Sequence, residues 1–473
     1  MKASFKAKVM RWLAAYARVF HRFLPSPFAI ALVLTAVAGL SSLLISAPDK
    51  VLQAWSDGLW NPSLMRFGFQ AMFMLVLGHV LALSAPVKYL LDKVVVLAVK
   101  KTAFAPAYVA FFALMLGWLN WGLGLVAGAL LAKSVIDKSK KHGYGIRPGL
   151  LGAAGYMGLL VWHSGLSGSA PLKVAESGHL LSLYPKGANW LQPISDSISI
   201  SSTVFSSWNI LITLGVVFSI VILFAVLGHL FLSPLSVAET RTDKEIFASE
   251  SHHRDLSINT SLAEKIDNGR GLAWSFGVLF IGTAFWLTLS SELQVSRLGF
   301  VTPDWINLVL LGLALLAHGS IKKLLSALEK AIGGASGILL QFPIYFGIMG
   351  IVTGTGLVDV LSGFLVSSTN ATTLPLAIFT SSGVLNIFVP SGGGQWAVQG
   401  PLVIEACHSM GMSLEKGIMA MAYGDQWTNM LQPFWALPLL GITKLKAQDI
   451  LPFTLAALFV SGFVFIVGLL IIS

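Results

Sequence analysis

The sequence predicts an all-α protein that crosses a membrane many times. Its 473 residues are 55% hydrophobic and only 11% charged, and their mean hydropathy is +0.78. Soluble domains carry about 25% charged residues, so this chain cannot cover a water-facing surface with polar groups. The composition excludes a soluble enzyme, a disordered scaffold and a nucleic-acid-binding protein. The lipid bilayer is the expected partner.

The first 26 residues are predicted to form a basic amphipathic segment at the cytoplasmic face. Arg11, Arg18 and Arg22 interrupt every stretch that could be the apolar region of a cleaved signal peptide. Trp12 and Tyr16 are spaced to share one face of a helix, which is typical of an interfacial segment.

Nine apolar segments are predicted to cross the membrane. A helix needs about 20 apolar residues to span roughly 30 Å of hydrocarbon. The predicted spans are 27–46, 67–84, 149–173, 208–232, 271–291, 304–318, 336–357, 416–441 and 449–472. The polar stretch 233–270, rich in charge and serine, is predicted to be a cytoplasmic linker.

Two further apolar segments, 104–132 and 375–400, are predicted to be re-entrant hairpins. Lysines flank the first on both sides, whereas no Lys or Arg lies in 358–374 or 401–415. If either segment crossed, one of its flanks would violate the positive-inside rule. The alternative, that both are long tilted helices, stays open. With hairpins, the N-terminus is inside, the C-terminus is outside, and six of the 31 Lys and Arg residues lie outside: Lys50, Arg66, Lys173, Lys186, Arg297 and Lys416.

An internal repeat is predicted from residues that recur in the same order at a nearly constant offset. The pairs are Pro27 and Pro303, Gln70 and Gln341, Asn120 and Asn386, Tyr156 and Tyr423, and Pro171 and Pro438. Repeat 1 spans 27–232 and repeat 2 spans 303–473, with a connecting helix and loop at 271–302 between them. With hairpins, each repeat has four predicted spans, and the connecting helix 271–291 makes five. Because five is odd, the second repeat is inverted in the membrane. Inverted repeats with interrupted helices are a secondary-transporter architecture.

The functional site is predicted where Gly, Pro, Ser and Asn interrupt the apolar runs. These places are the hairpin tips 117–124 and 381–396 and the broken helices 163–171 and 423–433. Irregular backbone at membrane depth is tolerated only where protein or a polar cavity satisfies it. The N-terminal ends of half-helices suit an anion, and their carbonyl ends suit a cation. Because these segments contain no Lys or Arg, we expect a small, singly charged anion.

Two ionisable residues in these breaks are functional candidates. Asp425 is the only acid well inside a predicted span, which makes it a candidate by default. It could instead stabilise a neighbouring break. His163 could carry a proton at physiological pH, or stay neutral and act through hydrogen bonds.

Several runs of sequence support a resemblance over nearly the whole chain. They are Trp-Ser-Asp-Gly-Leu-Trp at 55–60, Ser-Ala-Pro-Val-Lys at 84–88, Leu-Ser-Gly-Ser-Ala-Pro at 166–171, Val-Pro-Ser-Gly-Gly-Gly at 389–394 and Gln-Pro-Phe-Trp-Ala-Leu-Pro at 432–438. On these runs the chain resembles the bacterial short-chain fatty acid transporter family. The resemblance implies uptake of acetoacetate, butyrate and related monocarboxylates. It also implies membership of the wider ion-transporter superfamily, whose homodimers combine a scaffold with a mobile elevator-like domain.

The resemblance also bears on the coupling ion. Ser-Asn-Thr motifs at hairpin tips bind Na⁺ and carboxylate in relatives of that superfamily. In this chain Asn120 and Asn386 are the candidate sodium ligands, but Asn120 lacks flanking Ser and Thr. The coupling cation is therefore left open between H⁺ and Na⁺. No other metal and no cofactor is expected.

Residues and resemblance together predict a symporter of the bacterial inner membrane that imports short-chain monocarboxylates. Trp121, Trp396 and Trp427 would enclose the alkyl tail, and Gly392, Gly393 and Gln395 belong to the second tip. The residues expected to hold the carboxylate and a cation are Asn120, Asn386, Ser167, Ser169, Ser391, Asn429 and Gln432. Two alternatives remain: an intramembrane hydrolase that uses Ser164 with His163 or Asp425, and a monocarboxylate channel.

Overall fold

The computed structural model describes most of the chain. The described residues are 27–141, 145–183, 196–231, 261–290, 300–357, 360–361, 364, 367–388 and 392–472. The predicted N-terminal segment 1–26, most of the linker 233–270 and the candidate residue Ser391 lie outside them. Within the described residues the regular elements are all helices.

The first half of the chain contains helices α2 to α11. Most of them begin with a proline in the first turn, where its missing N–H and fixed φ favour a helix start. Their bounds are α2 Pro27–Ser42, α3 Pro48–Leu59, α4 Pro62–Ala82, α5 Ala85–Lys100, η1 Thr102–Phe104, α6 Ala105–Leu119, α7 Trp121–Lys141, α8 Pro148–Tyr156, η2 Met157–Leu160, α9 Ser169–Lys173, α10 His179–Ser182 and α11 Ser207–Phe231.

The second half of the chain contains helices α12 to α22. Their bounds are α12 Leu262–Asn268, α13 Arg270–Ser290, α14 Pro303–His318, α15 Ile321–Ile332, η6 Gly333–Ala335, α16 Ser336–Gly354, α18 Leu374–Phe388, α19 Gly392–Ser409, α20 Leu414–Thr428, η7 Asn429–Leu431, α21 Pro433–Thr443 and α22 Ala447–Ile472.

The predicted all-helical, multi-pass fold is confirmed. Five helices of the described chain are long and apolar enough to cross a membrane: Pro62–Ala82, Thr102–Leu119, Ser207–Phe231, Arg270–Leu289 and Ala447–Ile471. Shorter apolar helices lie in the predicted spans 27–46, 149–173, 304–318 and 336–357, whereas none is found among the described residues of the predicted span 416–441. The predicted spans 149–173 and 416–441 are each interrupted by irregular backbone, at 161–168 and 429–432.

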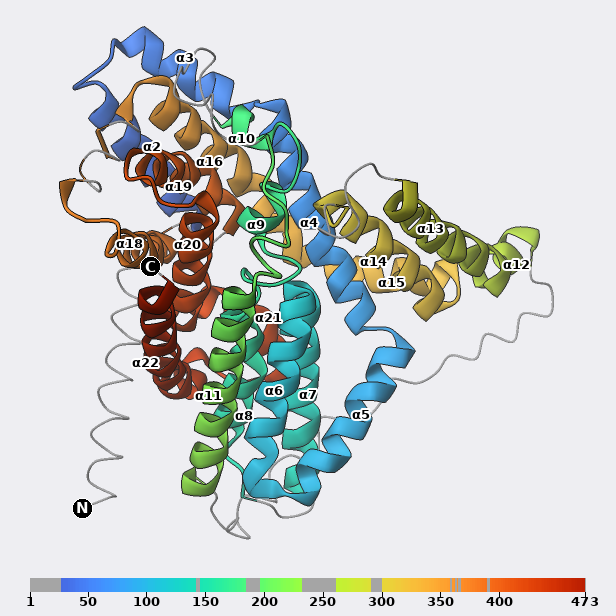
Figure 1. The fold of residues 1–473 in the computed structure, drawn as a ribbon. Coiled ribbons are helices and arrows are strands. Elements are labelled where there is room, and N and C mark those ends of the chain that lie inside the picture. The colour runs from blue at the N-terminus through green and yellow to red at the C-terminus, as the bar shows by residue number, and fades with distance from the viewer. Residues whose placement is uncertain are drawn as a thin grey trace.

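The chain reverses direction at Asn120, between α6 and α7. Asn120 has an extended backbone, with φ −157° and ψ 123°, and α6 and α7 lie side by side (Figure 1). They approach so closely that a Cβ built on Gly124 would lie 2.4 Å from the Cα of Gly117. Segment 104–132 is therefore a helical hairpin in shape. That it enters and leaves the membrane on one side stays a prediction.

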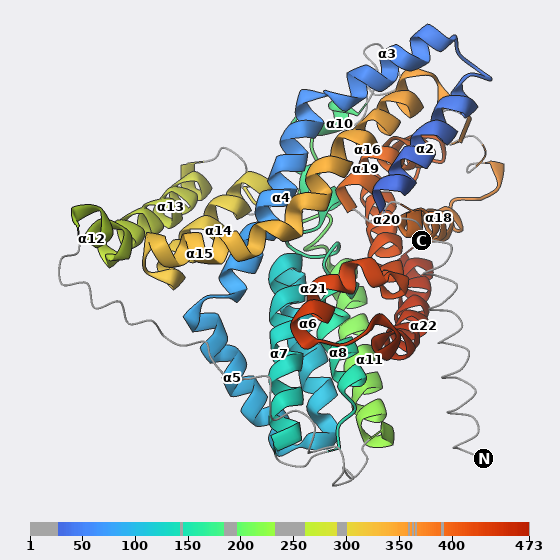
Figure 2. The same cartoon turned by 180° about the vertical axis from the view of Figure 1, so that it is seen from behind.

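The short helices α10 and α12 lie outside the predicted spans, and three longer helices were also not predicted because they are too polar for an apolar span. These are α3, α5 and α15, which carry charged residues along one side. Their charged residues keep the average hydropathy of each segment below that of a membrane span. They connect apolar helices, and α15 lies beside α13 and α14 on an arm that projects from one side of the molecule (Figures 1 and 2).

The two halves interlock instead of folding as separate bundles. Helix α4 of the first half packs on α14 of the second, and α16 of the second half packs on α2 and α3 of the first. Helices α6, α7, α8 and α11 gather at one end of the molecule, and α2, α3, α16 and α19 gather at the other (Figures 1 and 2). The inverted orientation of the halves in the membrane remains a prediction.

Glycines permit the closest of these contacts, as small residues do at helix interfaces in membranes. A Cβ built on Gly350 of α16 would lie 2.2 Å from the carbonyl oxygen of Ala54 in α3. A Cβ on Gly58 would lie 2.4 Å from the carbonyl oxygen of Phe346. Both values are far below van der Waals contact, so these positions accept only glycine without a shift of α3.

We predict that Gly350→Ala destabilises the protein by about 1–3 kcal/mol, the usual cost of overpacking. The thermal unfolding midpoint of the detergent-solubilised protein measures it. Gly282→Ala in α13 is the matched control, because nothing lies within 4 Å of the Cβ it would add. An equal midpoint for both variants would contradict the close α3–α16 contact.

Candidate functional site

The tip of the α6–α7 hairpin is fixed by hydrogen bonds to the first broken helix. Asn120 caps α7, because its Oδ1 accepts the Leu123 N–H at 2.8 Å. The Trp121 N–H donates to Ser167 Oγ at 2.9 Å, and the Leu166 N–H donates to the Trp118 carbonyl at 2.8 Å. The predicted residues Asn120 and Ser167 thus join two interruptions of the first half.

His163 and Asp425 meet although 262 residues separate them. His163 Nδ1 lies 2.9 Å from Asp425 Oδ2, and both side chains are buried. The Ala170 N–H donates to His163 Nε2 at 3.2 Å. Since Nε2 is the acceptor, the neutral ring carries its proton on Nδ1, facing the carboxylate. The two ionisable candidates therefore form one site.

Gln426 joins the broken backbone of the first half to α20 of the second. Its Oε1 accepts the N–H groups of both His163 and Ser164 at 3.0 Å, and its Nε2 donates to Ser164 Oγ at 3.2 Å. Asn209 of α11 donates to the Ser164 carbonyl at 3.1 Å and accepts from the Tyr423 hydroxyl at 2.7 Å. The break at 161–168 is thus satisfied by side chains from elsewhere.

A second polar cluster surrounds the break in α20–α21. Asn386 Nδ2 donates to the Asp425 carbonyl at 2.6 Å and to Asn429 Oδ1 at 2.9 Å. Gln432 donates to the Asn386 carbonyl, and the Tyr156 hydroxyl lies 3.0 and 3.1 Å from the carbonyls of Asn429 and Gln432. Asn386 lies within α18 instead of at the hairpin tip, unlike Asn120.

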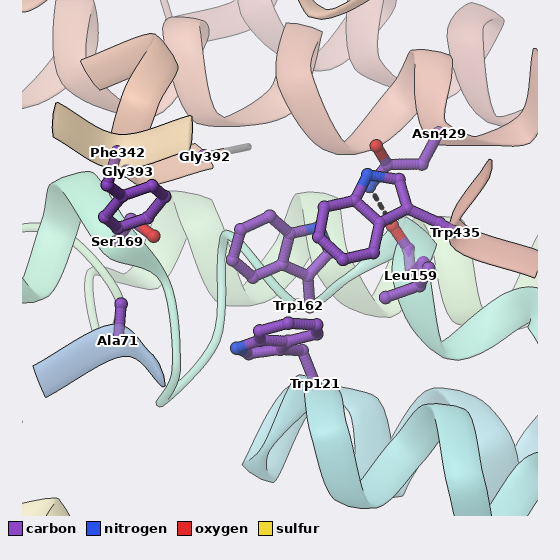
Figure 3. A pocket seen from close by; sticks show the side chains of 10 residues that line it. All are labelled: Ala71, Trp121, Leu159, Trp162, Ser169, Phe342, Gly392, Gly393, Asn429 and Trp435. Atoms are coloured by element: carbon purple, nitrogen blue, oxygen red, sulfur yellow. Dashed lines mark hydrogen bonds between the residues drawn. The ribbon is translucent and has the colours of Figure 1, made fainter. Parts of the chain in front are cut away.

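A narrow aromatic slot lies where the interrupted elements meet (Figure 3). It leaves about 20 Å³ for the centre of a water molecule, enough for a single water. None of its lining residues is charged. They are Ala71, Trp121, Leu159, Trp162, Ser169, Phe342, Gly392, Gly393, Asn429 and Trp435.

Both halves of the chain contribute matching positions to this slot. Ala71 of α4 and Phe342 of α16 are 271 residues apart, as are the first residues of α7 and α19, Trp121 and Gly392. The pairing matches the offset of the predicted repeat. Five of the lining residues, Trp121, Ser169, Gly392, Gly393 and Asn429, lie in the segments where the helix breaks predicted a site, and their role in binding stays a prediction.

The buried pair lies directly behind one wall of the slot. The Trp162 ring lines the slot and stacks on the His163 ring, with centroids 4.5 Å apart. A Cβ on Gly392 would lie 3.0 Å from His163 Cε1 and 3.1 Å from Asp425 Oδ2. Because residue 392 has no side chain, the Asp425 carboxylate lies close to the slot.

Three predicted residues of the second half lie away from the slot. The Trp396 indole donates to His179 Nε2 at 2.9 Å, and burial, followed by the Lys173 charge, lowers the pKa of that histidine. The Trp427 indole donates to the Leu458 carbonyl, and Gln395 donates to the Ser382 carbonyl. The tryptophans beside Trp121 in the slot are Trp162 and Trp435. Trp435 lies in the run at 432–438, and Trp162 directly precedes the broken helix at 163–171. Their positions next to the helix breaks could have identified both as candidates.

A small vestibule joins the slot to a charged cluster that sequence reasoning missed. The vestibule shares Ala71, Trp121 and Ser169 with the slot and continues to Gln70. Gln70 Oε1 accepts from the Lys173 ammonium at 3.1 Å, and its Nε2 donates to Asp304 at 2.7 Å. The remaining members, Glu176 and Arg66, form ion pairs with Lys173 and Asp304, respectively. Lys173 is the one buried Lys or Arg side chain among the described residues.

Interlocked apolar helices, broken at mid-length around an uncharged slot, form an architecture that known membrane transporters share. Two solved transporters share the fold. YdaH of Alcanivorax borkumensis has a TM-score of 0.54 at 13% identity, covering 95% of this chain and 97% of its own. MtrF of Neisseria gonorrhoeae, described within a class of antimetabolite efflux pumps, has a TM-score of 0.56 at 13% identity, covering 95% of both chains.

The sequence comparison identifies the family. The family model for short chain fatty acid transporters matches residues 8–472, so the chain belongs to that family. It is 34% identical over 455 residues to an Escherichia coli K12 protein, covering 96% of this chain and 97% of the relative. It is 34% identical over 469 residues to a Haemophilus influenzae protein, covering 98% and 99%. Both relatives are named as proposed short-chain fatty acid transporters.

We predict that Gln426→Leu destabilises the protein by about 1–3 kcal/mol for each backbone N–H that it leaves unpaired. The thermal unfolding midpoint should fall well below that of the control variant Gln53→Leu. Gln53 lies on the exposed side of α3, where its side chain donates a hydrogen bond to Asp57. Equal midpoints would mean that the 161–168 break does not depend on α20.

Proposed function

We propose that this protein imports short-chain monocarboxylates across the bacterial inner membrane by symport with H⁺ or Na⁺. The observation that carries the proposal is the uncharged aromatic slot at the junction of the helix breaks. Three indole rings and Leu159 offer an apolar wall for a short alkyl tail. Family membership and this small, uncharged cavity both favour a small monocarboxylate over a larger or multiply charged anion.

The opposite side of the slot suits a carboxylate. Ser169 and Asn429 present polar side chains, and Gly392 and Gly393 form the first turn of α19, an 18-residue helix. The N-terminus of a helix favours an anion through its free N–H groups and its dipole. Without side chains at these glycines, a carboxylate can approach the backbone. The slot is too narrow for the whole anion in this conformation, so substrate entry requires it to widen.

The buried His163–Asp425 pair is the proposed site of coupling. A carboxylate substrate in a low-dielectric slot needs a compensating positive charge. The Asp425 carboxylate can supply the binding site for that cation, behind Gly392 and beside the slot. A proton or Na⁺ bound there would offset the charge of the substrate during the crossing.

Transport would move the hairpins and the broken helices relative to α2 and α14. The vestibule and its cluster around Lys173 lie on the side predicted to be external. Breaking the contacts of Gln70 with Lys173 and Asp304 would open that route. The proposed assembly is a homodimer, as the family resemblance implies.

The hydrogen bonds of Ser164 and His163 argue against the alternative that the protein is a hydrolase. Ser164 Oγ donates to the Val161 carbonyl at 3.2 Å, and His163 Nε2 accepts from a backbone N–H. The imidazole base is thus engaged elsewhere and does not activate the hydroxyl. Uphill accumulation would separate a carrier from a channel.

We predict that purified protein in liposomes accumulates labelled butyrate or acetoacetate when an inward cation gradient is imposed. For one proton per anion, a gradient of one pH unit supports about tenfold accumulation. Uptake is measured with the H⁺ and Na⁺ gradients applied separately, and with empty liposomes as the control. Failure of both gradients to drive any monocarboxylate uptake would refute the proposal.

We predict that Asp425→Asn abolishes gradient-driven accumulation but keeps exchange of labelled for unlabelled substrate. The neutral amide fills the same volume, so the slot survives while the cation site is lost. Asp57→Asn, on the exposed side of α3, is the control and should behave as wild type. Wild-type accumulation by Asp425→Asn, or loss of exchange together with accumulation, would contradict the coupling role.

A further inference from the structure

A basic groove lies at the corner between the α4–α5 turn and α15, far from the slot in the fold. It is open and has about 370 Å³ of space for water. Three elements line it: the start of α5, the end of α14 and the exposed side of α15. The lining residues are Leu83, Ala85, Lys88, Ala317, His318, Lys323, Ser326, Ala327 and Lys330.

The groove concentrates unpaired positive charge. Lys88, Lys323 and Lys330 line it, and no lining residue is acidic. Among the described residues none of these three lysines forms an ion pair, whereas Arg66 and Lys173 both do. Three ammonium groups on two helices, left without counter-charges, make an attractive site for an anion.

The two helices that supply the lysines also carry exposed apolar side chains; Tyr89 lies beside Lys88, and Leu90 and Leu325 lie on other faces of their helices. Leu90 of α5 is 52% exposed, Tyr89 is 64% exposed and Leu325 of α15 is 49% exposed. A soluble anion would gain nothing from these residues, but the acyl chains of a lipid would cover them. The predicted topology also places these lysines on the cytoplasmic side, where anionic lipids attract basic clusters.

We infer that this groove binds the phosphate headgroup of an anionic phospholipid from the cytoplasmic leaflet. Lys88, Lys323 and Lys330 contact the phosphate oxygens, and the acyl chains cover the exposed Tyr89 ring next to Lys88. The inference follows from charge and exposure and does not depend on what the slot transports.

A lipid in this groove would connect two linking helices. Helix α5 connects α4 to the α6–α7 hairpin, and α15 connects α14 to α16. Helix α14 packs on α4, and His318 at its end contacts the Val80 carbonyl at 2.9 Å. The headgroup would therefore hold the start of α5 against the α14–α15 turn.

Native mass spectrometry of the full chain, released from detergent with added lipid, tests the inference. The probes are dioleoyl phosphatidylglycerol, which is anionic, and dioleoyl phosphatidylcholine, which is zwitterionic. We expect tighter binding of phosphatidylglycerol, and loss of about fivefold in affinity for each lysine replaced in K88Q, K323Q and K330Q, since each lysine near a lipid surface contributes about that factor.

The matched control is the triple variant K93Q, K100Q and K322Q, which removes as many charges from α5 and α15 outside the groove lining. Equal weakening of phosphatidylglycerol binding in this control and in the triple variant that combines K88Q, K323Q and K330Q would overturn the site. Full competition by inorganic phosphate at equal concentration would also overturn it, because the ligand would then be soluble phosphate. Thermal unfolding midpoints of both triple variants without lipid show whether either change acts through misfolding.

Discussion

The structure depends on one constraint: irregular backbone deep in an apolar interior must find hydrogen-bond partners. The break at 161–168 finds them in the other half of the chain. Gln426 of α20 accepts two successive N–H groups, at His163 and Ser164. An unpaired buried N–H costs about 1–3 kcal/mol, so the first break is more stable when α20 of the second half is packed against it. This requirement explains why the halves interlock.

The same contacts that satisfy the breaks create the candidate site. Breaking α8–α9 and α20–α21 at mid-length brings Ser169 and Asn429 to one slot, with the first turn of α19 beside them. It also places His163 in contact with Asp425. The residues proposed for coupling therefore also belong to the contacts that hold the breaks together. The relatives of known fold, YdaH and MtrF, show that this architecture recurs at 13% identity, where only the fold is comparable.

Sequence reasoning found the helices and their interruptions, because apolar windows and runs of Gly, Ser and Pro are local signals. It singled out His163 and Asp425 separately but could not pair them, since their contact depends on the packing of α20 against the first break. It chose Trp396 and Trp427 for the slot, whose indoles instead bond His179 and the Leu458 carbonyl. It also missed α3, α5 and α15, whose one-sided charge lowers their hydropathy. Which tryptophan faces a cavity is a property of tertiary packing.

The proposed mechanism requires the predicted topology, in which the two halves face opposite sides of the membrane and each contributes a re-entrant hairpin near the slot. The most direct measurement is labelling of single cysteines by a membrane-impermeant maleimide in intact cells, in a Cys407→Ala background. The account predicts that cysteines at Lys100 and Asp137, on either side of the first hairpin, are both protected. Cysteines at Thr372 and Ser409, on either side of the second, are both labelled. Opposite labelling of Lys100 and Asp137 would show that the first segment crosses the membrane, and would contradict the account.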